Sequence, residues 1–231
     1  MNLYIIYGSE SLLLKPYISS ISNDSICIRI YNNKVPEKRP NFFDFKFDNS
    51  FEKNFLDKFN LFSKKIKKII FIGAASILET NLFISSEEKI IEKIININVK
   101  NYIRISKLLI PLMGKLKSGT FIYLSSFRSI KPTKGTILYS STKSFCETFF
   151  KGIGREYGRL NITSHIIRMG AFDGKMLHNL GDEYKKKVNK QISLGREGTP
   201  QELSDTIKFC EQNPYTNNGI IEINGGLNID L

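Results

Sequence analysis

Cysteine, histidine and long apolar stretches are scarce in this sequence of 231 residues. The three cysteines (Cys27, Cys146 and Cys210) are scattered and only two histidines occur, so neither a disulfide framework nor a metal site is expected. No apolar run reaches the roughly 18 residues that cross a bilayer, and residues 1–4 lack the basic region of a secretion signal. These absences predict a cytoplasmic protein with reduced thiols and no membrane segment.

Acidic residues are outnumbered by basic ones, 22 to 34, which gives a formal net charge of +12. This charge is typical either of a lysine-coated surface or of a protein that attracts anionic ligands such as nucleotides and acyl carriers. The basic runs at 64–68 and 185–190 are far apart and lack interleaved aromatic residues. Nucleic acid is therefore not expected among the partners.

Short apolar runs alternate with helical patterns along the chain, which predicts a parallel sheet covered by helices on both faces. We expect one α/β domain over residues 1–231, a doubly wound sheet in a three-layer αβα arrangement. Strands are predicted at 3–7, 25–31, 42–47, 69–72, 120–124, 162–168 and 219–223, and helices at 12–22, 51–64, 86–113, 139–157 and 200–212. The connection at 32–40 is too short for a crossover helix, so this flank should be thin or covered by a partner chain.

Tyr139 and Lys143 lie four positions apart in a predicted helix and therefore share one helix face. An ammonium close to a phenol stabilises the phenolate, so such a pair can give and take a proton near neutral pH. Ser126, thirteen positions upstream, follows a predicted strand, and its hydroxyl can hold a carbonyl or alcohol oxygen. The pattern predicts a proton-transfer site that needs a separate hydride carrier; the alternative is an ordinary surface pair.

With Asn98 added, these residues resemble the short-chain dehydrogenase/reductases, whose pattern is a serine followed thirteen positions later by Tyr-x-x-x-Lys. The segments 198–202 (Gly-Thr-Pro-Gln-Glu) and 224–226 (Asn-Gly-Gly) also resemble family motifs. The resemblance implies a Rossmann-like fold, with Tyr139 as general acid/base and Lys143 bound to the nicotinamide ribose. It further implies that Ser126 binds the substrate oxygen and that Asn98 anchors a water relay to Lys143.

The family's phosphate loop, Thr-Gly-x-x-x-Gly-x-Gly, is degraded here. Residues 7–14 read Tyr-Gly-Ser-Glu-Ser-Leu-Leu-Leu and keep only Gly8. Because the lost glycines let the backbone approach a pyrophosphate, Leu12, Leu14 and the charge of Glu10 predict a dinucleotide that binds weakly, in a shifted pose or not at all. The resemblance places the cofactor against Gly8, Ser9, Leu13, Arg29, Ala74, Ala75, Tyr139, Lys143, Gly170 and Phe172.

The residues at the end of the second strand indicate which dinucleotide is preferred, since an acidic residue there favours NAD. No acid occurs over residues 29–34. NADP is therefore favoured over NAD, with Arg29 or Lys34 beside its 2′-phosphate; the alternative is that both are ordinary surface cations.

The sequence thus predicts an NAD(P)-dependent oxidoreductase that interconverts a carbonyl and a secondary alcohol. Residues 171–195 would form the substrate lid, and their five lysines favour an anionic substrate unless they are simply solvated. Since relatives often pair their two long helices, a homodimer or homotetramer is expected. The alternative is a catalytically inactive relative, kept for binding or assembly after losing its dinucleotide.

Overall fold

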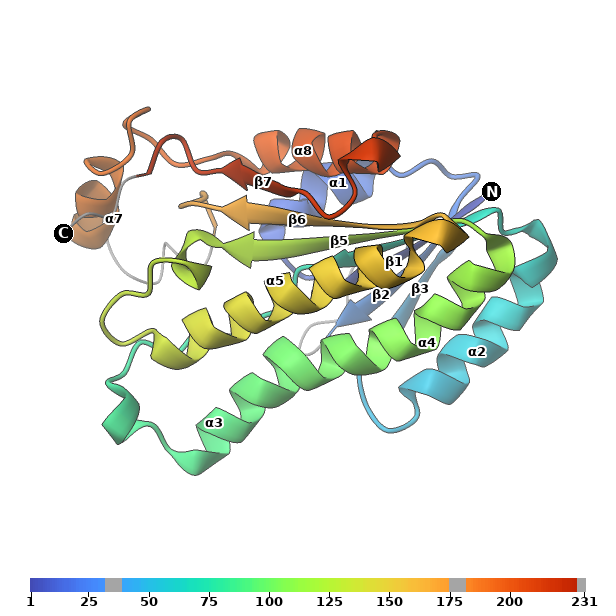
Figure 1. Ribbon diagram of the computed structural model, residues 1–231, viewed down its shortest axis with the longest axis horizontal. Helices are drawn as coiled ribbons and strands as arrows, with labels where there is room; N and C mark the ends of the chain where they lie inside the picture. The colour runs from blue at the N-terminus through green and yellow to red at the C-terminus, as the bar shows by residue number, and fades with distance from the viewer. Residues whose placement is uncertain (32–38, 175–181, 228–231) are drawn as a thin grey trace.

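Seven parallel strands form one sheet in the order β3-β2-β1-β4-β5-β6-β7 (Figure 1). The computed structural model describes residues 1–31, 39–174 and 182–227. Because the chain begins in the middle of the sheet and winds outward in both directions, the predicted doubly wound fold is confirmed. The strands are β1 (Asn2–Tyr7), β2 (Ile26–Tyr31), β3 (Phe42–Lys46), β4 (Lys68–Gly73), β5 (Gly119–Ser126), β6 (Ile162–Met169) and β7 (Ile220–Ile223).

Helices cover both faces of the sheet and complete the three layers. They are α1 (Lys15–Ser20), α2 (Phe51–Phe62), α3 (Glu88–Ile95), α4 (Asn101–Leu116), α5 (Ile137–Tyr157), α7 (Asp182–Asn189) and α8 (Pro200–Gln212). One core joins the sheet to α2, α4 and α5, and a second joins it to α1 and α8. None of the helices in the described ranges is long and apolar enough to span a membrane.

Strand β1 is apolar on both faces because each face meets a helical layer. In β1, Leu3, Ile5 and Tyr7 enter the first core. Tyr4 and Ile6 alternate with them and enter the second. A continuous apolar run is therefore the expected appearance of such a strand.

The predicted helix at 86–113 is observed as a continuous helical run over 88–116, which contains a π turn that the sequence did not indicate. A π turn at Asn96–Lys100 separates α3 from α4. The carbonyl oxygen of Asn98 accepts a hydrogen bond from the Cys146 thiol at 3.1 Å, so at this turn the backbone bonds to α5. π turns are frequent at functional sites.

Charged and aromatic side chains lie together on β2 and β3, and the connection between these strands lies largely outside the described residues, so the expected thin flank stays a prediction. Arg29 pairs with Asp44 on β3, and its Nε lies 2.7 Å from a carboxylate oxygen. Two guanidinium groups lie over the ring of Phe42, at 5.1 Å (Arg29) and 4.3 Å (Arg39) from its centroid. Coverage of this flank by a partner chain stays a prediction.

Candidate active site

Tyr139 and Lys143 stand on the first turns of α5 and are both buried, with 6% and 3% exposure. The Lys143 ammonium donates to the carbonyl oxygen of Leu124 at 2.8 Å. It lies 4.9 Å from the ring centroid of Tyr123 and 5.7 Å from that of Tyr139. Across the described ranges no residue hydrogen-bonds the Tyr139 hydroxyl, and that hydroxyl is not sealed from solvent. The phenol is therefore open to a ligand while the ammonium is fixed beside it.

Ser126 is the last residue of β5, two positions after the carbonyl group that holds Lys143. Its hydroxyl oxygen accepts a hydrogen bond from the Arg128 amide at 3.2 Å and caps the 3-10 turn Phe127–Ser129. The strand end thus brings Ser126 to the part of the sheet where α5 begins. The strand that ends in Ser126 is thus bonded to the helix that carries Tyr139 and Lys143.

Asn98 is buried beside this site and its side chain is fully engaged. Its amide oxygen accepts from the Ile77 amide at 2.9 Å, and its amide nitrogen donates to the Ile77 carbonyl at 3.0 Å and to the Thr142 hydroxyl at 3.1 Å. Asn98 therefore ties the loop after β4 to α5, next to Lys143. Its role in a water relay stays a prediction.

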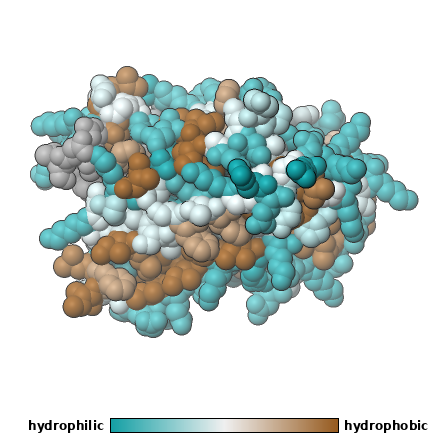
Figure 2. All heavy atoms as spheres, in the orientation of Figure 1, coloured by the Kyte–Doolittle hydropathy of each residue, from teal (hydrophilic) through white to brown (hydrophobic). Residues whose placement is uncertain are grey.

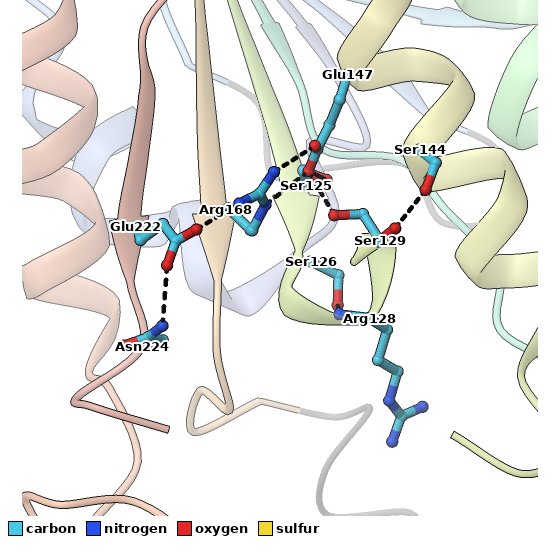
Figure 3. Close-up of polar contacts among 9 residues, drawn as sticks. All are labelled: Ser125, Ser126, Arg128, Ser129, Ser144, Glu147, Arg168, Glu222 and Asn224. Atoms are coloured by element: carbon cyan, nitrogen blue, oxygen red, sulfur yellow. Dashed lines mark hydrogen bonds and ion pairs between the residues drawn. The ribbon is translucent and has the colours of Figure 1, made fainter. Parts of the chain in front are cut away.

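A buried carboxylate one turn beyond Lys143 was missed in the sequence. Glu147 accepts hydrogen bonds from the hydroxyls of Ser125 and Ser129, both at 2.6 Å, and from Arg168 on β6 at 2.7 Å (Figure 3). Arg168 also pairs with Glu222 on β7. The available signal was an arginine inside a predicted buried strand, together with a glutamate on the inward face of α5.

Hydrogen bonds keep this carboxylate ionised. Burial raises the pKa of the Glu147 carboxyl, but the hydrogen bonds from Arg168, Ser125 and Ser129 outweigh that effect and hold the pKa below its usual value. The group is therefore a fixed negative charge, balanced by Arg168.

The first turn after β1 joins β4 closely, as a cofactor loop requires. Gly8 has a φ of +89°, and a Cβ added there would lie 2.5 Å from the Ala75 amide nitrogen. The amides of Ala74 and Ala75 donate to the Tyr7 carbonyl at 2.8 and 2.9 Å. Three of the predicted cofactor residues, Gly8, Ala74 and Ala75, are thus brought together.

The residues beside this turn fit a dinucleotide phosphate in part. Ser9 is buried, and its hydroxyl has no hydrogen-bond partner among the described residues, so a phosphate oxygen would satisfy it. Leu14 is fully buried in the core and Leu12 is 39% exposed, so the two residues do not both fill the crevice. A Cβ added at Gly174 would lie 3.2 Å from the Leu13 side chain, which places Leu13 across the crevice from that residue.

Gly170 and Phe172 follow β6 and pack against neighbouring segments. The Gly170 amide donates to the Ile223 carbonyl at 3.0 Å, and a Cβ at Gly170 would lie 2.7 Å from the Asn224 Cα. Phe172 is buried in the core and pairs with Gly198. Its ring serves packing, so a cofactor contact from Phe172 would have to come from its backbone.

The structure does not support the prediction that Arg29 binds a 2′-phosphate. Arg29 lies two residues before the end of β2, its side chain is 5% exposed, and both of its terminal contacts with Asp44 are short, at 2.7 and 2.9 Å. Its charge is already balanced by the half-buried carboxylate of Asp44. Lys34 lies outside the described residues.

The predicted lid at 171–195 includes helix α7, and residues 175–181 lie outside the described ranges. Lys185 pairs with Glu197 at 3.2 Å, and Lys187 pairs with Glu183 at 3.3 Å. Helix α7 lies beyond the carboxyl ends of β6 and β7 (Figure 1). The assignment of this segment as a lid stays a prediction.

Comparison with known proteins gives consistent results. A family model described as short chain dehydrogenase matches residues 31–185. The 3-oxoacyl-[acyl-carrier-protein] reductase FabG of Buchnera aphidicola subsp. Schizaphis graminum is 30% identical over 167 residues, covering 71% of this chain and 68% of that protein. The reductase of the same name from Chlamydia muridarum is 26% identical over 160 residues, covering 68% and 64%. The match thus spans about two thirds of the length of these relatives.

Solved structures match over nearly the whole chain. A 4-hydroxyisoleucine dehydrogenase complexed with NADH has a TM-score of 0.86 at 18% identity and covers 100% of both chains. ElxO with NADP bound has a TM-score of 0.83 at 20% identity and covers 98% of both chains. At these identities the likeness supports the fold.

Proposed function

The chain belongs to the short chain dehydrogenase family, and from this premise we propose that it interconverts a carbonyl and a secondary alcohol with a nicotinamide dinucleotide. The observation that carries the proposal is the arrangement at the start of α5. The Tyr139 hydroxyl is open to a ligand, while Lys143 is buried and bonded to the strand that ends in Ser126. An ordinary surface pair of tyrosine and lysine would be exposed, and its lysine would not be hydrogen-bonded to a buried strand.

The side chains divide the proton chemistry among them. The Ser126 hydroxyl donates a hydrogen bond to the substrate carbonyl oxygen and orients it. The Tyr139 hydroxyl then gives its proton to that oxygen, and the Lys143 ammonium stabilises the phenolate that remains. When bound, the nicotinamide supplies the hydride; Gly8, Ser9, Ala74 and Ala75 would hold its dinucleotide.

Two finer points belong to the proposal. The preference for NADP no longer rests on Arg29, but it keeps the support that no acidic residue stands at the end of β2. The substrate class is drawn from the two relatives described above, which are both named as 3-oxoacyl carrier-protein reductases. We therefore expect a 3-oxoacyl thioester to be reduced, which agrees with the net charge of +12.

The proposal is tested by binding and turnover. NADPH or NADH should raise the melting temperature in a saturable way, and acetoacetyl-coenzyme A should be reduced. Tyr139→Phe should lower kcat by about 100-fold or more, since general acid catalysis contributes that much, and leave dinucleotide binding intact. Tyr215→Phe, which changes a fully exposed tyrosine, is the matched control. If neither dinucleotide binds at millimolar concentration, the inactive alternative holds; unchanged turnover in Tyr139→Phe refutes the proton role.

Assembly through the long helices also belongs to the proposal. Apolar side chains gather over α5 and over the neighbouring segment 82–84 (Figure 2). Ile84, Ile137 and Phe145 are 92%, 57% and 46% exposed. Apolar groups of this size that are left in water indicate an interaction surface, which supports a homodimer that pairs α5 with its copy.

A further inference from the structure

Glu147 is buried in the site, yet the proton chemistry above does not use it. We propose that Glu147, held by Arg168, is a positioning residue that fixes the Ser126 turn against Tyr139 and Lys143. This inference rests on the proposed function. It assigns to the reaction a pair of charged residues that contact neither the reacting atoms nor the expected cofactor.

The hydrogen bonds of the carboxylate are directed at the turn that carries Ser126. Ser125 stands immediately before Ser126, and Ser129 ends the 3-10 turn that follows it. Both hydroxyls donate to the same oxygen, Oε1 of Glu147, at 2.6 Å. A third bond from α5 reinforces this tie, because the Ser144 hydroxyl donates to the Ser129 carbonyl (Figure 3). The turn is thus bound at both ends to the helix that carries Tyr139 and Lys143.

The ion pair with Arg168 makes this arrangement rigid. Arg168 donates to both oxygens of Glu147, with Nε at 3.1 Å and a terminal nitrogen at 2.7 Å. This bidentate contact fixes the rotation of the carboxylate, and with it the direction in which Oε1 faces the serines. Burying two charges gives little net stability, so fold stability alone does not account for the pair.

The network also reaches the side where the cofactor is expected. Arg168 pairs with Glu222, which accepts a hydrogen bond from the Asn224 amide at 3.4 Å. Asn224 in turn packs against Gly170. One connected set of polar contacts therefore runs from the Ser126 turn through Arg168 to Asn224, which lies against the residue that follows β6.

The first test replaces the carboxylate by an amide of the same shape. In Glu147→Gln one oxygen becomes an NH2 group, which cannot accept from Arg168 and leaves that cation without its buried partner. We expect kcat to fall about 10- to 100-fold, since a misplacement of about 1 Å reduces catalysis to this extent. The KM for the dinucleotide should stay within about twofold, because the first turn after β1 is untouched.

The second test separates positioning from folding. Ser125→Ala/Ser129→Ala removes both ties to the turn and leaves the ion pair in place. It should lower kcat as Glu147→Gln does, and combining all three changes should add no further loss, because the residues act through one contact. Glu52→Gln breaks an exposed pair with Arg104 and serves as the control with unchanged kcat. A merely structural role would lower the melting temperature and leave kcat at 25 °C unchanged.

The outcomes are distinguishable from failure of the proposed function. If the wild type turns over and the folded variants keep kcat within about twofold, the inference is wrong although the function stands. If Glu147→Gln does not fold, the serine variant decides. If the wild type shows no turnover, a crystal structure of the serine variant decides: the Ser126 hydroxyl should move by about 1 Å or more relative to Tyr139, and an unmoved hydroxyl overturns the inference.

Discussion

Gly8→Ala tests whether the first turn after β1 is built as tightly as the structure indicates. Gly8 has a φ of +89°, which residues with a Cβ rarely adopt. A Cβ added there would lie 2.5 Å from the Ala75 nitrogen and 2.9 Å from the Ala74 carbonyl carbon. Both contacts are with backbone atoms, so no side chain can rotate away. The loop after β4 must therefore move.

The expected size of the effect follows from two terms. A left-handed conformation costs about 1–2 kcal/mol for a residue with a Cβ. Displacing the loop weakens the two bonds from Ala74 and Ala75 to the Tyr7 carbonyl, at 2.8 and 2.9 Å, each with a net contribution of about 0.5–1.5 kcal/mol. We expect a loss of about 3 kcal/mol, which lowers the melting temperature of a chain of this length by roughly 6–12 °C.

Thermal unfolding followed by circular dichroism measures this shift, and a second glycine provides the control. A Cβ added at Gly152, in the interior of α5, meets nothing within 4 Å. Gly152→Ala should therefore stabilise the protein by about 0.5–1 kcal/mol through helix propensity. A melting temperature for Gly8→Ala within about 2 °C of the wild type would refute the close packing of this turn.

Two further predictions concern pH and assembly. His165 is fully buried, and its two ring nitrogens lie 3.2 Å from the hydroxyls of Thr163 and Thr216. Burial lowers the pKa of His165 from 6.5 to about 4. As pH falls, the unfolded chain therefore binds the proton at a higher pH than the folded chain, and the free energy of unfolding should fall by up to about 3 kcal/mol between pH 6.5 and pH 4. Urea unfolding at pH 7 and pH 5 should show this slope reduced in His165→Gln, and an equal slope in both proteins would contradict it. Phe145→Glu should shift the mass found by light scattering toward the 26.5 kDa monomer, whereas Phe209→Glu, 46% exposed on the opposite layer, should not; a monomeric wild type would end the assembly proposal.

The sequence predicts best those features in which the residue pattern is set by the geometry of one strand or one helix alone. The apolar run at 3–7 appears as strand 2–7, because a strand buried on both faces carries apolar residues at successive positions. The predicted strand at 162–168 appears as strand 162–169, although it also carries the buried polar residues Thr163, Ser164, His165 and Arg168. Tyr139 and Lys143 were found because a helix places every fourth residue on one face. These inferences need no knowledge of what lies across the sheet.

Predictions failed where a residue's partner comes from another strand. Arg29 looked like a free cation near a strand end, but strand register sets it opposite Asp44, fifteen residues away. The π turn at 96–100 has no residue type that marks it. Glu147 and Arg168 are 21 positions apart, and only the packing of α5 on β6 shows that they meet.

The loss of glycines from the phosphate loop and the retention of the proton site are compatible, because they affect different stages of the reaction. Leu14 replaces a family glycine and is fully buried, so the chain first forms the 3-10 turn Leu12–Leu14, and the six-residue helix α1 begins only at Lys15. We expect a leucine at this position to keep the helix start farther from the strand than glycine would allow, and so to weaken the binding of a pyrophosphate. Tyr139 and Lys143 lie on α5, which this change does not touch. The expected kinetic result is a high KM for the dinucleotide with an ordinary kcat, since uniform binding is lost while stabilisation of the transition state remains.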